Sequence, residues 1–148
     1  MVVALPSKAK TSHIPWATYT EPELAQVGLT EAAAREEHGD KLEVVRFEYE
    51  HNDRAIAERK TTGLIKVMVV KGRPVGASIA GHQAGELINL WSLVLANNMK
   101  MSQVAAMVSP YPTIGEVNNR AAGAYFSPRL FKSDLIKRVV GLVQRIIP

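Results

Sequence analysis

One uninterrupted apolar segment constrains the fold of this chain more than any other feature. Residues 64–70 are apolar at every position except Lys66. Such a run is typical of a central strand that is covered on both faces. Lys71-Gly72 follows as a tight turn, and residues 75–80 run back antiparallel. The chain is therefore expected to build a sheet around this hairpin.

Two further segments have the pattern of strands. Residues 42–51 alternate between apolar residues on one face and charged residues on the other. Residues 13–20 also favour a strand, and Pro15 confines it to a sheet edge or a strand start because proline has no N–H to donate. The charged segment 52–60 predicts a loop or an irregular edge.

The remaining periodic segments indicate helices, most of them in the second half of the chain. These segments are 31–37, 83–98, 102–108, 114–125 and 133–147. Thr30 and Ser102 are the candidate N-caps of the two short ones. Residues 83–98 are apolar on nearly every side, so this helix must be covered all round, by its own core or by another subunit.

The order of these segments predicts the fold class. A strand, a helix, three strands and then helices favour an α+β fold, with a mainly antiparallel β-sheet of about four or five strands layered with helices. The length of 148 residues fits one compact domain. We therefore expect a linker over residues 1–12, a domain over residues 13–128 and an amphipathic C-terminal helix over residues 129–148.

The usual enzyme motifs are missing. The chain has no cysteine, which excludes a zinc–thiolate site and any thiol chemistry by this chain alone. Gly76 and Gly81 have the spacing of a phosphate-binding loop, but His82-Gln83 stands where Lys-Ser/Thr should follow. On composition and spacing, the chain reads as a domain without an active site of its own.

Binding to a metal, to nucleic acid or across a membrane is equally unsupported. The four histidines are far apart and form no i,i+4 pair, so no metal site is expected. Arg54, Arg59 and Lys60 have no aromatic partner beyond Tyr49 and read as a solvated edge, so no nucleic acid partner is expected. The chain has neither a signal peptide nor an apolar stretch of about 18 residues, and the predicted location is cytoplasmic.

One proline-rich segment is the most informative. Pro110 and Pro112 flank Tyr111, and Glu116 lies one helical turn further on. Thr113 and Glu116 fit a capping box at a helix start, in which each side chain bonds the backbone N–H of the other. Tyr111 fits an interface aromatic or, because the prolines fix its direction, a residue that belongs to a site. The residues alone leave these interpretations open.

This segment, residues 109–116, resembles the His-x-His-Pro-Thr-x-x-Glu signature of the flavin-dependent pyridine nucleotide–disulfide oxidoreductases. The family includes dihydrolipoamide dehydrogenase, glutathione reductase and mercuric reductase, and the signature lies in its C-terminal dimerisation domain. Further segments that are similar to this domain are 14–23, 27–31, 63–66, 76–81 and 84–88. Together they extend the resemblance over about residues 14–124.

The resemblance implies a homodimer in which each domain delivers its loop to the flavin and redox disulfide of the partner subunit. Tyr111 stands where the family has its acid/base histidine, and Glu116 where it has the residue that orients that histidine. Pro112 and Thr113 would approach the flavin through their backbone, and the bond before Pro112 is expected to be cis. FAD and NAD(P)H would bind the enzyme's own cofactor-binding domains, which these residues do not include. The isolated chain should therefore bind neither cofactor and be inactive.

The chain departs from the signature at both histidines. Ser109 and Tyr111 replace them. The unperturbed pKa of tyrosine is about 10, so at pH 7 a phenol donates a hydrogen bond but accepts a thiol proton poorly. Mercuric reductase also has tyrosine here, but its C-terminal cysteine pair has no counterpart in this chain. The resemblance thus predicts a flavin- and NAD(P)H-dependent oxidoreductase without specifying its electron acceptor.

Two alternatives stay open. The chain can be a non-catalytic dimerisation or interaction module that has lost the His–Glu dyad. It can also be a basic domain that contacts a membrane surface peripherally, because the helix expected over residues 133–147 places apolar residues on one face and basic residues on the other. Such a helix can equally pack on its own domain or a neighbouring one.

Overall fold

The computed structural model describes residue 11 and residues 13–132. The strands are β1 (Trp16–Thr18), β2 (Glu23–Gly28), β3 (Leu42–Glu48), β4 (Leu64–Val70) and β5 (Arg73–Gly81). The helices are α1 (Glu31–His38), α2 (Asp53–Ala57), α3 (Ala84–Ala96), α4 (Met101–Ala105) and α5 (Glu116–Lys132), with short 3-10 turns η1 (Gly39–Lys41) and η2 (Tyr49–His51). Apart from Thr11 and the end of α5, the linker and the C-terminal helix predicted from sequence lie outside the described residues.

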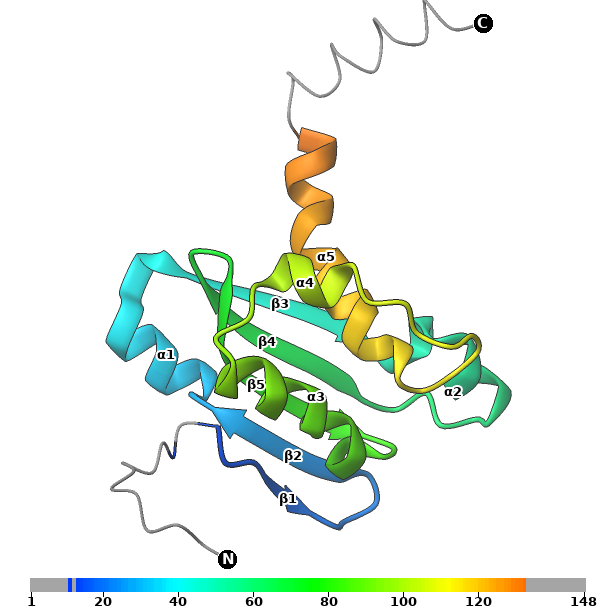
Figure 1. Cartoon of the computed structure of the whole chain (residues 1–148). Coiled ribbons are helices and arrows are strands. Elements are labelled where there is room, and N and C mark those ends of the chain that lie inside the picture. The colour runs from blue at the N-terminus through cyan, green and yellow to red at the C-terminus, as the bar shows by residue number, and fades with distance from the viewer. Residues whose placement is uncertain (1–10, 12, 133–148) are drawn as a thin grey trace, which may run out of the picture.

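The five strands form one antiparallel sheet in the order β1-β2-β5-β4-β3, as Figure 1 shows. This confirms the predicted α+β class and its antiparallel sheet. The hairpin from β4 to β5 turns at Lys71 and Gly72, both at positive φ, as a tight two-residue turn requires. The strand that follows Pro15 is the edge strand β1.

The core lies between the sheet and the helices α3, α4 and α5, which cover one of its faces (Figure 1). Its large buried side chains include Ile65, Val67, Ile79, Ile88, Trp91, Met101 and Val117. The start of α3 is anchored over β2, because the Gly85 amide donates to Glu23 Oε2 at 2.9 Å. No helix among the described residues is long and apolar enough to cross a membrane.

The N-terminal end of the sheet differs from the prediction. The expected strand over residues 13–20 is limited to Trp16–Thr18, and a second strand, Glu23–Gly28, pairs with it. The polar residue Gln26 lies within this strand and obscures the apolar pattern that would have predicted it. Its side chain is nonetheless buried, and its amide donates to the carbonyls of Val27 and Leu29 at 3.1 Å each.

Segment 52–60 was expected to be a loop or an irregular edge, and this was wrong. After β3 ends at Glu48 the chain forms η2 and then the helix α2 over Asp53–Ala57. The Asn52 side chain caps α2 by accepting from the Ala55 amide at 2.8 Å. Five residues are too few to display a helical period, so the cap rather than an apolar pattern marks this helix.

Two helix boundaries also differ. The short helix α4 begins at Met101 after Lys100, not after Ser102, and the Gln103 side chain accepts from the Lys100 amide at 2.8 Å. The helix expected over residues 114–125 begins at Glu116 and continues past Pro128 to Lys132. It therefore spans the position where a domain boundary was expected.

Helix α3 is covered on one side only. Leu87, Ile88 and Trp91 face its own core and are buried. Leu93 on the outer side is 57% exposed. The chain's own sheet thus accounts for part of the apolar surface of α3, and an apolar residue is left on the outside.

Candidate functional site

The loop over residues 109–115 leaves α4, runs beside α2 and returns to α5, as Figure 1 shows. It carries Tyr111, Pro112 and Thr113, and Glu116 follows as the first residue of α5. The structure thus keeps all four predicted site residues in one loop and the helix start behind it. The Tyr111–Pro112 peptide is cis, which confirms the expectation drawn from the resemblance.

Tyr111 projects from this loop and is 68% exposed. Its hydroxyl donates a hydrogen bond to Asp53 Oδ2 at 2.8 Å. This bond raises the pKa of the Tyr111 phenol, and the charges of Asp53 and Glu116 raise the pKa further while Arg120 lowers it. The phenol is therefore protonated at neutral pH and can hold a proton at its oxygen.

Asn52 joins the loop to α2 through hydrogen bonds to both. It is 2% exposed, and its Nδ2 donates to the Thr113 carbonyl at 3.1 Å while its Oδ1 caps α2. The Thr113 hydroxyl donates to the Pro110 carbonyl at 2.8 Å, which closes the loop on itself. Ile114 is buried in the core. The loop is therefore held through the Thr113 carbonyl and the Tyr111 hydroxyl, while most of the Tyr111 side chain stays exposed.

Glu116 pairs with Arg120 on the next turn of α5. Its side chain is only 12% exposed, and its Oε1 lies 3.6 Å from Arg120 Nε. Its amide donates to the Thr113 carbonyl at 3.4 Å. Thr113 and Glu116 are thus engaged differently from the reciprocal capping box that the sequence suggests. Glu116 influences the Tyr111 phenol through its charge.

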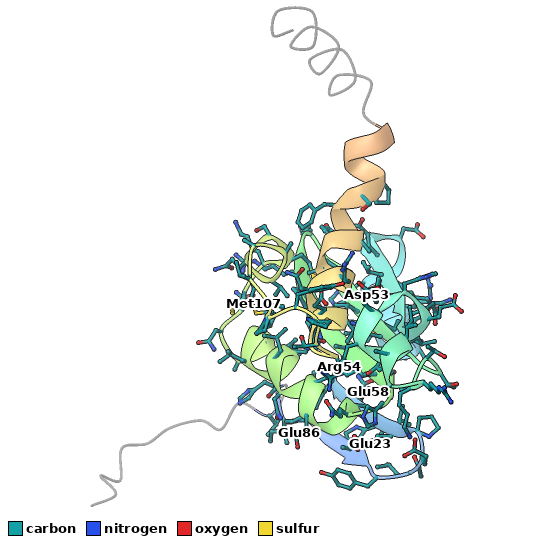
Figure 2. The ribbon with its side chains drawn as sticks, turned by 90° about the vertical axis from the view of Figure 1, so that its right-hand side faces the viewer. Glu23, Asp53, Arg54, Glu58, Glu86 and Met107 are labelled. Carbon is teal, nitrogen blue, oxygen red and sulfur yellow. The ribbon has the colours of Figure 1, made fainter. Side chains whose placement is uncertain are left out.

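A surface pocket of about 230 Å³ adjoins the loop. It is lined by Pro112, Thr113 and Ile114 of the loop, by Arg54 and Glu58 at α2, and by Gln83 before α3. Arg54 and Glu58 form an ion pair, and His82 Nε2 lies 3.6 Å from Glu58. Figure 2 shows Asp53, Arg54 and Glu58 on the same side of the molecule. The loop therefore borders a small polar surface that belongs to α2.

Asparagines that the sequence analysis did not single out hold this site in place. Asn118 Oδ1 accepts from Trp91 Nε1 at 2.7 Å, which joins α5 to α3. Asn119 Nδ2 donates to three carbonyls at and after α4, including that of Met107 at 2.8 Å. Asn52 could have been recognised as an N-cap before Asp53. Asn118 and Asn119 have no such local signal, because their partners are distant in sequence.

No group of three or more histidine, aspartate or glutamate side chains is placed to hold a metal ion within the described part of the chain. The groups that the loop and its surroundings present are one phenol and two nearby carboxylates. These groups can orient a ligand and hold a proton.

Comparison with known proteins places this arrangement in context. The family described as "Pyridine nucleotide-disulphide oxidoreductase, dimerisation domain" matches residues 14–122. A dihydrolipoyl dehydrogenase of Bacillus subtilis (strain 168) is 38% identical over 111 residues, which are 74% of this chain and 23% of that protein. A mercuric reductase of Shewanella putrefaciens is 37% identical over 112 residues, which are 74% of this chain and 20% of that protein.

Solved structures agree with these sequence relatives. The HOCl-induced flavoprotein disulfide reductase RclA from Escherichia coli, in its Cu(II) complex, superimposes with a TM-score of 0.71 at 27% identity, over 76% of this chain and 26% of that one. LpdA from Mycobacterium tuberculosis has the same fold, with a TM-score of 0.73 at 20% identity, over 79% of this chain and 26% of that one. The chain thus spans about a quarter of the length of the proteins it matches.

Proposed function

Because this chain belongs to the family of pyridine nucleotide–disulphide oxidoreductase dimerisation domains, we propose that it pairs two subunits of a flavin-dependent NAD(P)H oxidoreductase. In this proposal each copy supplies Tyr111, Pro112, Thr113 and Glu116 to the flavin and disulfide site of the partner subunit. The observation that carries the proposal is the loop itself. Asn52 anchors it at the Thr113 carbonyl, yet its Tyr111 side chain is exposed.

The residues of the loop fit a flavin that is held elsewhere. The pocket beside Pro112 and Thr113 measures about 230 Å³. Pockets that enclose a ligand of drug size measure roughly 300 to 1,000 Å³, so this pocket is too small to enclose a dinucleotide by itself. Asn52 bonds the Thr113 carbonyl and so holds the backbone of Pro112 and Thr113 in place to touch the cofactor. When bound, the flavin would supply electron transfer from NAD(P)H.

The residues of this chain would then act on the acceptor side of the reaction. The raised pKa keeps the Tyr111 phenol protonated, so it would orient an acceptor or a redox sulfur by hydrogen bonding rather than remove a thiol proton. Glu116 would tune the phenol through its charge. The rigid loop, held by Asn52 and Ile114, would keep the phenol in place while the two subunits meet.

Homodimerisation would use the outer side of α3 together with the start of α5. Leu93 of α3 is exposed, and so are Met107 and Val108, which lie between the end of α4 and the loop over residues 109–115. Exposed apolar side chains of this kind are typical of surfaces that become buried in an assembly. On this basis the isolated chain would dimerise, bind neither FAD nor NAD(P)H and be inactive.

The test is to purify the complete natural polypeptide that contains this segment and record its mass and visible spectrum. We expect a chain several times the length of this one, with flavin absorption bands that NAD(P)H bleaches. A colourless polypeptide of about 148 residues would contradict the proposal. The spectrum reports the cofactor directly, so the acceptor need not be known.

A second candidate function is a non-catalytic interaction module, and a specific observation favours it. The phenol of Tyr111 bonds Asp53, and Glu116 pairs with Arg120, so the histidine–glutamate dyad of the family has no equivalent pair here. Tyr111→Phe in the complete enzyme separates the two functions, with Tyr19→Phe as a control at another exposed tyrosine. A loss of turnover confined to Tyr111→Phe supports the catalytic role, and unchanged turnover with every acceptor supports the module.

A further inference from the structure

We propose that Asp53 is the positioning residue for the Tyr111 phenol. Its carboxylate would hold the hydroxyl hydrogen on the α2 side, so that the phenolic oxygen meets the incoming group as a hydrogen-bond acceptor. The catalytic consequence of this inference rests on the proposed function of the loop. The contact itself is a property of the chain alone, since both residues belong to it.

The first observation is the direct contact. The Tyr111 hydroxyl donates to Asp53 Oδ2 at 2.8 Å, across 58 positions of sequence. Aspartate as the acceptor makes this a charge-assisted bond, which is stronger and more directional than a bond between neutral groups. An exposed tyrosine on a loop would otherwise rotate its hydroxyl freely.

The second observation is that the neighbouring residue grips the same loop. Asn52, directly before Asp53, donates to the Thr113 carbonyl at 3.1 Å and is buried. The donor in that bond is Nδ2, while the Oδ1 atom of the same side chain accepts from the Ala55 amide at 2.8 Å and caps α2 at the residue before Asp53. Two consecutive residues of α2 and its cap thus hold the loop at two points, one on the backbone and one on the phenol.

The third observation concerns the other charged groups that face the phenol. From α5 these are Glu116 and Arg120, which lie 3.6 Å apart and pair with each other. Their charges act on the phenol in opposite directions. The carboxylate that contacts the hydroxyl is therefore the one on α2, and the residue at the position of the family's orienting glutamate is engaged elsewhere.

The number of hydrogen-bond donors and acceptors on the Tyr111 phenol limits the ligands that it can bind. A phenol has one hydrogen and two lone pairs. With its hydrogen on Asp53, Tyr111 can only accept a hydrogen bond from a ligand, such as one from a thiol S–H or an N–H group of the partner subunit's site. The ligand class is therefore a hydrogen-bond donor, and an anionic group such as a thiolate would be disfavoured.

The first experiment uses the 148-residue chain and needs no flavin. Tyrosine labelled with ¹³C at Cζ is followed by NMR through an alkaline titration, and Tyr111→Phe assigns the resonance. We expect Asp53→Asn to lower the pKa of Tyr111, and Glu116→Gln to lower it less. Glu50→Gln, at an exposed acid that pairs with His51, is the matched control and should leave it unchanged.

The outcome that overturns the inference is equally direct. An unchanged Tyr111 pKa in Asp53→Asn would refute the contact, as would a larger shift in Glu116→Gln. Circular dichroism spectra that match the parent chain exclude unfolding as the source of any change. Asp53→Glu keeps the charge and should retain most of the raised pKa.

The second experiment uses the complete enzyme. Asp53→Ala removes the acceptor and should reduce turnover by about threefold to tenfold, the worth of one orienting hydrogen bond. The same substitution in a Tyr111→Phe background should have no further effect. If the substitution at Asp53 reduces turnover equally in the Tyr111→Phe background, the role of Asp53 is merely structural. If the complete polypeptide proves colourless, the proposed function fails while the titration result stands, so the two failures are distinguishable.

Discussion

Asn118 joins α5 to α3 by two hydrogen bonds. It is buried, accepts a hydrogen bond from Trp91 Nε1 at 2.7 Å and donates to the Leu87 carbonyl at 3.1 Å. Burying a polar group costs free energy unless the group is hydrogen-bonded. The Asn118 side chain meets this requirement for the Trp91 indole N–H and for its own amide. The helix that follows the candidate site is thereby fixed to the helix proposed for the dimer surface.

Asn118→Ala should lower the free energy of unfolding by about 2 to 3 kcal/mol, because it leaves the buried indole N–H without an acceptor. Urea denaturation followed by tryptophan fluorescence measures the change. Asn119→Ala is the matched control in the next position. It removes bonds to carbonyls near the surface, and we expect a loss of about 1 kcal/mol. Equal losses in the two variants would contradict this account of Asn118.

Glu31 makes the stability of the chain depend on pH. Its carboxylate bonds Lys66, Arg35 and Arg46 at 2.8, 2.7 and 3.3 Å. These bonds lower its pKa from 4.5 to about 2, with Lys66 contributing most. A group whose pKa is lower in the folded state stabilises that state above its unfolded pKa. This stabilisation is lost as the pH falls from about 4.5 towards 2.

Glu31→Gln should therefore destabilise the chain by about 1 kcal/mol at pH 7, a value reduced by solvent screening at a surface site. The difference from the parent chain should shrink as the pH falls through 4 and vanish near pH 2. Denaturation curves at a series of pH values test this. Glu36→Gln, at an exposed acid on the same helix, should show no such trend. A difference that does not change with pH would count against the ion cluster.

Strand β5 passes so close to the segment after β2 that only glycine fits at one position. A Cβ at Gly76 would lie 2.0 Å from the Leu29 carbonyl oxygen and 2.7 Å from the Leu29 amide nitrogen. These are backbone atoms, which cannot rotate away as a side chain does. Gly39, at the end of α1, differs because its Cβ would meet nothing within 4 Å and only its φ of +52° favours glycine.

Gly76→Ala should cost about 3 kcal/mol or more, since the backbone must shift to relieve the clash. Gly39→Ala should cost less, about 1 to 2 kcal/mol, because the cost is limited to a backbone conformation, φ 52° and ψ −130°, that alanine rarely adopts. Thermal unfolding of both variants at pH 7 gives the comparison. Similar midpoints for the two would mean that the strand crossing is looser than the structure indicates.

The elements differ in how well the sequence predicted them. The hairpin of β4 and β5 was predicted correctly because an apolar run and the Lys71-Gly72 turn are local signals. Strand β2 and helix α2 were missed for two physical reasons. Gln26 is polar yet buried through its own hydrogen bonds, and α2 over Asp53–Ala57 is stabilised by a cap rather than by an apolar face.

At the scale of the whole molecule, the site was only partly predictable. The segment from Tyr111 to Glu116 was identified from its prolines and its resemblance to a family signature, and its cis bond follows from the same source. The partners of the loop could not be predicted. Asp53 lies 58 positions and Asn52 61 positions from the groups they bond. No local pattern reports such contacts, because they exist only once the sheet has brought α2 beside the loop.

The proposed dimer surface can be tested by a pair of substitutions on opposite sides of the sheet. Leu93→Glu on α3 should shift the dimer toward monomer by at least about tenfold in dissociation constant, because a buried charge opposes association. Leu24→Glu is the control, since Leu24 is 40% exposed and alternates with the core residue Ala25, so it lies on the sheet face opposite α3. Sedimentation velocity compares the two. Equal weakening would place the interface elsewhere.

Light scattering coupled to gel filtration on the 148-residue chain, at about 1 to 100 µM, shows whether the chain forms a dimer. A dimerisation domain that buries a specific interface should associate without its cofactor domains. We expect a mass approaching twice the 16.2 kDa of one chain as the concentration rises. A mass of 16.2 kDa at every concentration would contradict it.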